Sequence, residues 1–125
     1  MNLNDDQKVV FIAMSKHYFF FRRHAVKYVL DQGCTPISQF GIFDYFITDG
    51  VDRDSVRKAN NNLIRKADEM WVFGPISDGV LAEVKIFRDK MPIRYFDIID
   101  SKEVKEITKN EVQFEEGLEK YADHL

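Results

Sequence analysis

The sequence contains little cysteine and no long apolar run, and both scarcities narrow the classes of protein that it can encode. One cysteine in 125 residues excludes a disulfide framework and a zinc site built on a cysteine cluster. No apolar run approaches the length of about 18 residues that a membrane-spanning helix needs, so no membrane partner is expected. The first eight residues are polar and acidic and do not resemble a signal peptide. We therefore expect a cytoplasmic protein.

Basic residues are in a slight minority. Eighteen Lys and Arg face 21 Asp and Glu, which gives a formal net charge of −3. A globally acidic domain is a poor general binder of nucleic acid, so none is expected as a partner. The other residues are typical of a folded protein, with 45% hydrophobic and 14% aromatic side chains. The length suits one domain and is too short for two of ordinary size, so we predict a single domain over residues 1–125.

Apolar patterns of strand and helix alternate along the chain. Buried strands are predicted at residues 8–14 and 69–74, a short strand at 35–37 with Pro36 at its beginning or on an edge, and a further strand at 91–96. Helices are predicted at 17–32, at 54–66 and from 77 onward. This alternation implies right-handed crossovers and an α/β fold. We expect three layers: a doubly wound, mostly parallel sheet of four or five strands with helices on both faces. Flavodoxin and Rossmann folds have this arrangement. Residues 101–125 alternate Lys and Glu and predict a peripheral helical segment.

Ligands of such folds bind beyond the carboxyl ends of the strands, which here selects the loops at 13–17, 38–53 and 74–79. The glycine fingerprints of a P-loop NTPase and of a standard dinucleotide-binding domain are absent, and the three histidines are too scattered for an obvious metal site. No cofactor and no metal are therefore expected.

Glu83 is the most informative residue near these loops. It lies three residues after Val80 and four before Phe87, so it shares the apolar face of its helix. Burying a carboxylate on such a face is costly unless the carboxylate is paired. Glu83 therefore either enters the pocket or takes a structural role, at the rim or in hydrogen bonds to backbone or arginine.

Two further features point to the same region. Asn60 shares a helix face with Val56, Leu63 and Ala67, and its amide either contacts a ligand or satisfies a buried backbone group. The start of the next helix, at residues 77–79, offers free amide groups to an anion or a hydroxyl-rich ligand, although Ser and Asp are also common in ordinary helix caps.

Several of these segments resemble the nucleoside 2-deoxyribosyltransferase-like superfamily of small α/β proteins. They are residues 9–13, 67–74, 77–83 and 92–96. In that family a glycine at a helix start precedes, by four residues, a glutamate that attacks the anomeric carbon of the sugar, and Gly79 and Glu83 match this spacing. The resemblance implies N-glycosidic bond cleavage or deoxyribosyl transfer on a nucleoside or nucleoside 5′-monophosphate, with Glu83 as the catalytic residue. It further implies substrate binding by Ala13, Met14, Ser15, Phe40, Asn60, Ser77, Asp78 and Gly79.

One position departs from the family pattern. An aspartate commonly lies eight residues before the aspartate that opens the third strand, and counting back from Asp68 leads to Asn60. An amide keeps hydrogen bonding but loses the charge and any proton transfer. Two alternatives therefore stay open: a non-catalytic nucleotide-binding or sensing module of the same fold, and a TIR-like NAD glycohydrolase, which also uses a Glu and a strand similar to residues 11–15.

Aromatic residues suggest two structural features around the pocket. Residues 40–46 are rich in them and predict a partly mobile flap that stacks on the base, with a short helix or an interface patch as the alternative. The aromatic content predicts a homo-oligomer, a dimer or larger, because unburied aromatic patches commonly mark interfaces. The resemblance implies the same, since members of that superfamily commonly form dimers or larger assemblies. Residues 112–125 are the predicted interface because Phe114, Leu118 and Tyr121 fall on one helical face, and docking on the same subunit is the alternative.

Overall fold

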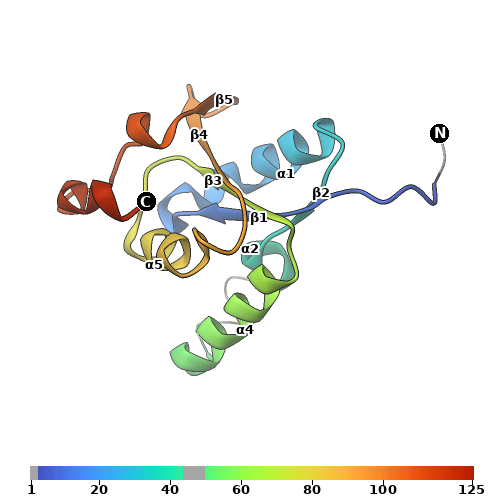
Figure 1. Cartoon of the computed structure of the whole chain (residues 1–125), viewed down its shortest axis with the longest axis horizontal. Coiled ribbons are helices and arrows are strands. Elements are labelled where there is room, and N and C mark those ends of the chain that lie inside the picture. Colours follow the sequence, from blue (N-terminus) through green and yellow to red (C-terminus); the bar gives the residue numbers. More distant parts are fainter. Residues whose placement is uncertain (1–2, 44–49) are drawn as a thin grey trace.

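The computed structural model describes residues 3–43 and 50–125 and contains one five-stranded sheet with helices on both sides (Figure 1). The strands are β1 (Val9–Met14), β2 (Thr35–Ile37), β3 (Glu69–Phe73), β4 (Ile93–Ile99) and β5 (Glu103–Ile107). Their order is β2-β1-β3-β4-β5, and all pairings are parallel except that of β4 with β5. The predicted three-layer α/β fold with a mostly parallel sheet is confirmed.

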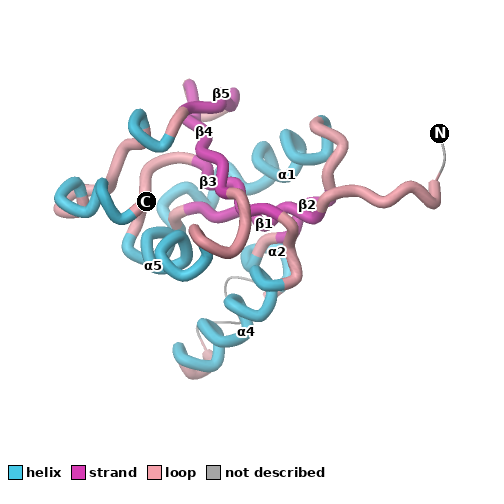
Figure 2. Tube along the Cα trace, in the orientation of Figure 1, coloured by secondary structure: helices cyan, strands magenta, loops and turns pink. Residues whose placement is uncertain are grey.

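The helices divide between the two faces of the sheet (Figure 2). The α-helices are α1 (Arg22–Asp31), α2 (Gln39–Ile42), α4 (Arg53–Arg65) and α5 (Asp78–Phe87), and the 3₁₀ helices are η1 (Lys16–Phe21), η2 (Lys109–Glu111) and η3 (Glu119–His124). Successive strand residues point to opposite faces, so Val10 and Ile12 of β1 pack toward α1. Phe11 and Ala13 pack toward α4 and α5 on the other face.

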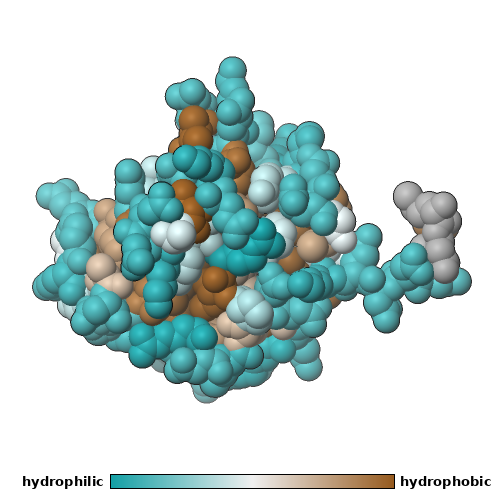
Figure 3. All heavy atoms as spheres, turned by 45° about the horizontal axis from the view of Figure 1, so that its top comes forward, coloured by the Kyte–Doolittle hydropathy of each residue, from teal (hydrophilic) through white to brown (hydrophobic). Residues whose placement is uncertain are grey.

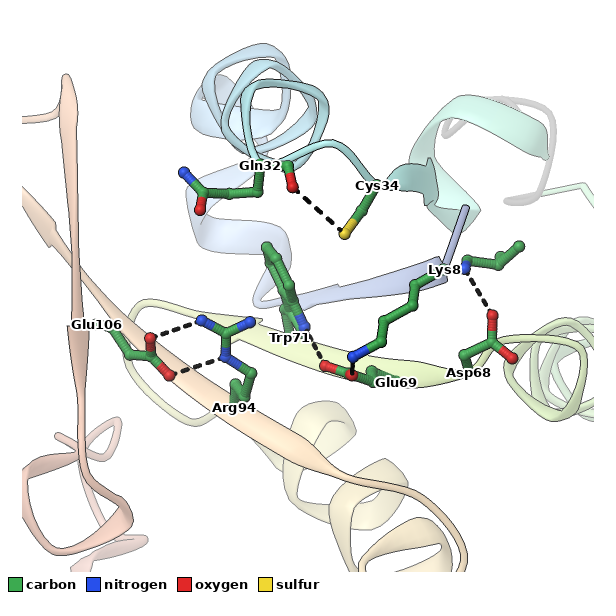
Figure 4. A network of polar contacts seen from close by, with 9 residues as sticks. Lys8, Gln32, Cys34, Asp68, Glu69, Trp71, Arg94 and Glu106 are labelled. Atoms are coloured by element: carbon green, nitrogen blue, oxygen red, sulfur yellow. Dashed lines mark hydrogen bonds and ion pairs between the residues drawn. The ribbon is translucent and has the colours of Figure 1, made fainter. Parts of the chain in front are cut away.

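A network of charged side chains spans β3, β4 and β5 (Figure 4). The guanidinium group of Arg94 lies 4.4 Å from the centre of the Trp71 ring and forms two hydrogen bonds, of 2.8 and 2.6 Å, to Glu106. Glu69 is buried, and its carboxylate accepts hydrogen bonds from Lys8 Nζ at 2.7 Å and Trp71 Nε1 at 3.0 Å. Burial raises the pKa of Glu69, but these two donors outweigh it and the pKa is lowered overall. Glu69 is thus a fully partnered structural carboxylate.

The predicted helical segment at 101–125 begins instead with strand β5. Asp100 and Ser101 adopt positive φ values of 53° and 58°, and Lys102 N donates to Ile99 O at 3.1 Å, which makes a tight hairpin turn from β4. Val104 then packs against the α1 side of the core while its charged neighbours face solvent. The helical prediction was wrong here because an edge strand with one solvated face can carry alternating Lys and Glu as readily as an exposed helix.

The C-terminal residues dock on their own chain. Ile76 N donates to Gln113 O and Glu115 N donates to Ile76 O, both at 2.9 Å, so the tail runs parallel to the loop between β3 and α5. Phe114 and Tyr121 pack against the core on the α4 and α5 face. The single helical stripe expected over 112–125 does not form, since η3 is a 3₁₀ helix of six residues.

Homo-oligomerisation stays a prediction. The face in Figure 3 is mostly hydrophilic, and its hydrophobic atoms gather in small groups between polar ones. Large exposed hydrophobic side chains include Phe20, in η1 just before α1, and Leu30, on α1.

No helix in the described part of the chain combines the length and apolar character needed to cross a membrane.

Two glycines with left-handed backbone provide a matched test of this architecture. Gly33 (φ +77°) ends α1 and has open space around it, whereas a Cβ atom on Gly74 (φ +81°), which follows β3, would lie 3.0 Å from Ile98 Cδ1. We expect Gly33→Ala to lower the free energy of unfolding by about 1 kcal/mol through backbone strain alone. Gly74→Ala should cost up to about 1 kcal/mol more, because the end of the Ile98 side chain must also shift. Urea unfolding of both variants measures the difference, and equal losses would contradict the close packing of β4 over Gly74.

Candidate functional site

A cavity of about 640 Å³ lies at the carboxyl ends of β1 and β3, between α4 and α5. This is the place that the fold predicts for a ligand. The predicted site residues in its wall are Met14, Ser15, Phe40, Asn60, Ser77, Asp78, Gly79 and Glu83. Ala13 is the exception, because strand alternation turns it into the core on the α4 and α5 face.

Helix α5 brings Glu83 to the cavity. Ser77 caps its start by accepting a hydrogen bond from Val80 N at 3.3 Å, and Asp78 lies in the first turn, where the helix dipole favours negative charge. Val80 and Val84 then face the core, and Glu83 lies between them on the buried side. The residue is only 9% exposed. Glu83 is thus buried and lines the cavity, as its place on the apolar helix face predicts.

Helix α4 brings Asn60 to the same place. Asp52 caps this helix through a hydrogen bond from Ser55 N at 3.1 Å, and Asn60 and Ile64 form its buried side. Asn60 is 6% exposed. The helix turns its 60 and 64 positions, one helical turn apart, toward the sheet, and the adjacent Ala59 is exposed.

Asn60 and Glu83 form a buried polar pair. The Asn60 side chain lies near enough to the Glu83 carboxyl group to favour its ionised form. Burial raises the pKa of Glu83 from its usual value of 4.5 to about 8, and Asn60 opposes this rise only in part. Within residues 3–43 and 50–125, no group satisfies the remaining buried oxygens, Asn60 Oδ1 and Glu83 Oε2. Both oxygens are almost inaccessible to solvent, and such unsatisfied acceptors are rare in folded proteins.

The C-terminal segment contributes a carboxylate that no local pattern indicated. Glu115 Oε2 accepts a hydrogen bond of 2.7 Å from Ser15 Oγ and lies 3.1 Å from His17 Nδ1. Ser15 is buried at the end of β1, so this contact joins the tail to the cavity wall. Glu115 lies in an acidic run, and no local feature of the sequence distinguishes it from the neighbouring glutamates. Its position at the cavity follows from the docking of residues 113–115 beside Ile76.

Basic side chains also line the cavity. Lys16 follows β1, and Arg53 and Arg57 lie on the first turns of α4. They face a wall that carries Asp78, Glu83 and the helix start of α5. Positive charge together with free amide groups at a helix start suits a ligand with an anionic group.

Aromatic and aliphatic side chains cover another part of the wall. Phe40 and Phe43 contribute from α2 and its C-terminal end, and Ile86 from α5. Residues 40–42 of the predicted flap belong to the short helix α2, and Phe43 caps its C-terminal end. A short helix was the alternative considered for this segment. Residues 44–46 of the same prediction lie outside the described part of the chain.

The buried carboxyl group has a consequence for stability. Between pH 4.5 and about 8 folded Glu83 keeps a proton that the unfolded chain releases, so rising pH destabilises the wild-type protein across this range. We expect Glu83→Gln to remove this effect and to be more stable than wild type by about 2 to 3 kcal/mol at pH 7. The difference should vanish below pH 4.5, grow up to pH 8 and stay constant above. Urea unfolding at several pH values measures it, with Glu103→Gln on β5 as the exposed control, and a difference independent of pH would contradict the prediction.

A comparison with protein families finds one match. A domain of unknown function, DUF7768, matches residues 13–96, which include the end of β1 and all of α4 and α5. Glu115 lies beyond the matched region. Neither a curated protein nor a solved structure matches the chain significantly. The chain therefore belongs to the DUF7768 family of domains of unknown function.

Proposed function

We propose that the protein cleaves the N-glycosidic bond of a nucleoside or nucleoside 5′-monophosphate, with Glu83 as the nucleophile. The observation that carries this proposal is the buried carboxyl group of Glu83, which lies beside Asn60 in the wall of a cavity at the strand ends. A desolvated carboxylate that is held in one orientation is well suited to attack a carbon centre.

The reaction would proceed in two steps. In the first, a lone pair of the Glu83 carboxylate forms a bond to the anomeric carbon, and the electron pair of the glycosidic bond leaves with the base nitrogen, which takes up a proton from solvent. In the second, water adds to the anomeric carbon, the electron pair of the ester bond returns to Glu83, and the water releases a proton. One water is consumed for each free base, and a second base in place of water would make the reaction a transfer.

The other cavity residues fit the parts of such a substrate. Phe40 and Phe43 provide flat apolar surfaces for a base. Lys16, Arg53 and Arg57 provide positive charge for a 5′-phosphate, with the amide groups at the start of α5 as further donors. A volume of about 640 Å³ is also ordinary for a small-molecule site.

A non-catalytic nucleotide-binding module is the second candidate. One observation favours it: with a pKa of about 8, Glu83 is mostly protonated at neutral pH and can donate a hydrogen bond rather than attack. Asn60 also stands where the nucleoside 2-deoxyribosyltransferase-like superfamily, which the chain resembles, commonly has an aspartate, and an amide cannot transfer a proton. Turnover decides between the two candidates.

Glu83→Gln tests the role of the carboxylate. We expect wild-type protein to release free base from at least one member of a panel of nucleosides, nucleoside 5′-monophosphates and NAD, and the variant to lose at least about 1,000-fold in kcat. Binding of the same compound should change less than about tenfold, because Gln preserves the shape of the side chain and can still pair with Asn60. Chromatography of the free base and calorimetric titration measure the two quantities, with Glu103→Gln as control. Full turnover in Glu83→Gln would refute the nucleophile assignment.

The pH dependence of the reaction provides an independent test. Only ionised Glu83 can attack, so kcat/KM should rise about tenfold per pH unit below pH 8 and level off above it. A general acid at this position would produce the opposite profile, with activity that falls above pH 8. Initial rates between pH 5 and 9.5, with subsaturating substrate, distinguish the two.

A further inference from the structure

His17 and Glu115 form a pair in the cavity wall that the proposed mechanism does not use. Both residues line the same cavity as Glu83. The Nδ1 atom of His17 lies 3.1 Å from Glu115 Oε2. The His17 side chain is 66% exposed and the Glu115 side chain is 23% exposed, so the ring is open to water while its partner is largely covered.

Ser15 and the loop before α5 hold the Glu115 carboxylate in place. Ser15 is 1% exposed, and its Oγ accepts a hydrogen bond of 3.2 Å from His17 N and donates one of 2.7 Å to Glu115 Oε2. The backbone of the tail is also fixed, because Glu115 N donates to Ile76 O at 2.9 Å. Glu115 is therefore a fixed acceptor beside the imidazole ring.

These contacts decide which nitrogen of the ring carries the proton. An ionised carboxylate only accepts hydrogen bonds, and the single proton of Ser15 Oγ already goes to Glu115. In the contact with Glu115 the donor is therefore His17 Nδ1, and the neutral ring has its lone pair on Nε2. All polar contacts of the ring with the part of the chain that the structure describes involve Nδ1, which leaves Nε2 free to accept a proton.

We propose that His17 Nε2 is the general base of the second step and that Glu115 positions it. The inference rests on the proposed function, which forms a glycosyl ester on Glu83. The water oxygen bonds to the anomeric carbon, the electron pair of the ester bond returns to Glu83, and a proton of the water passes to the Nε2 lone pair. Glu115 holds the ring in the tautomer that accepts this proton, and the imidazolium then releases the proton to solvent.

Histidine suits this step better than the cationic and amide groups of the cavity. Lys16, Arg53 and Arg57 are cationic at neutral pH and have no lone pair to accept a proton. The amide of Asn60 cannot take up a proton either. An imidazole ring is the side chain whose ordinary titration range includes neutral pH, so it can accept a proton in one turnover and release it before the next.

The test separates the two steps. Wild type and His17→Gln are assayed with adenosine, cytidine, guanosine and uridine, their 2′-deoxy counterparts and the 5′-monophosphates of both sets. For the compound that wild type cleaves fastest, we expect His17→Gln to lower kcat by about 100-fold or more. The ratio kcat/KM should change less than about threefold, because it reports on the first step, which releases the base.

A stalled second step also accumulates the covalent intermediate. His17→Gln should release a burst of about one base per protein molecule and should gain the mass of the sugar. The double variant with Glu83→Gln should show neither. Azide attacks the anomeric carbon without loss of a proton, so it should raise the kcat of His17→Gln and leave that of wild type almost unchanged.

Two variants of the C-terminal segment form a matched pair. Glu115→Gln keeps the shape of the side chain but removes the charge that fixes the tautomer, so we expect kcat to fall about tenfold with kcat/KM retained. Glu116 lies beside His17 in an adjoining hollow, and Glu116→Gln should change neither quantity. A role in docking the tail alone would instead lower kcat and kcat/KM of Glu115→Gln together, without a burst.

Nitrogen-15 NMR of the wild-type rings keeps the test independent of the folding of any His17 variant. With the signals of His24 and His124 assigned from their own variants, we expect neutral His17 to carry its proton on Nδ1. A proton on Nε2 would overturn the proposal. Unchanged kcat in His17→Gln, or a parallel loss of kcat and kcat/KM without a burst, would also overturn it and leave the glycosidase proposal intact. Absence of base release by wild type from every compound would overturn both.

Discussion

The parallel pairing of β1 with β3 holds the two strand ends that carry the site at one edge of the sheet. The register aligns Val10 with Glu69 and continues to Met14 and Phe73, and both strands are buried on their two faces. The loops that follow them therefore start side by side, one leading to Ser15 and the other to the cap of α5. A change that weakened this pairing would move every wall of the cavity at once.

Two buried glutamates differ in the number of hydrogen-bond donors around their carboxyl groups and in the direction of their pKa shifts. Glu69 and Glu83 are 6% and 9% exposed, so burial penalises both carboxylates. Glu69 has a lysine and an indole as donors, and its pKa falls. Among the described residues Glu83 has the Asn60 amide alone to oppose the effect of burial, and its pKa rises to about 8. Ionisation of Glu83 therefore opposes folding, whereas ionisation of Glu69 favours it.

The C-terminal segment completes the cavity from outside the matched family region. Residues 113–115 lie along the loop before α5, and Glu115 reaches Ser15 at the end of β1. The same segment covers the core on the α4 and α5 face with Phe114. Docking of the tail thus serves both the stability of the fold and the shape of the site, so a truncation before residue 112 would disturb both.

Local patterns in the sequence were sufficient for the central strands, for α5 and for the burial of Glu83 and Asn60, because apolar periodicity reports directly which side of an element faces the core. They were misleading at β5, where alternating Lys and Glu suits an edge strand and an exposed helix equally. No local pattern indicated the role of Glu115, which contacts Ser15 across 100 positions of the chain. Tertiary structure alone decided these features, because the contacts that define them join segments with no shared periodicity, and only the packed sheet brings them together.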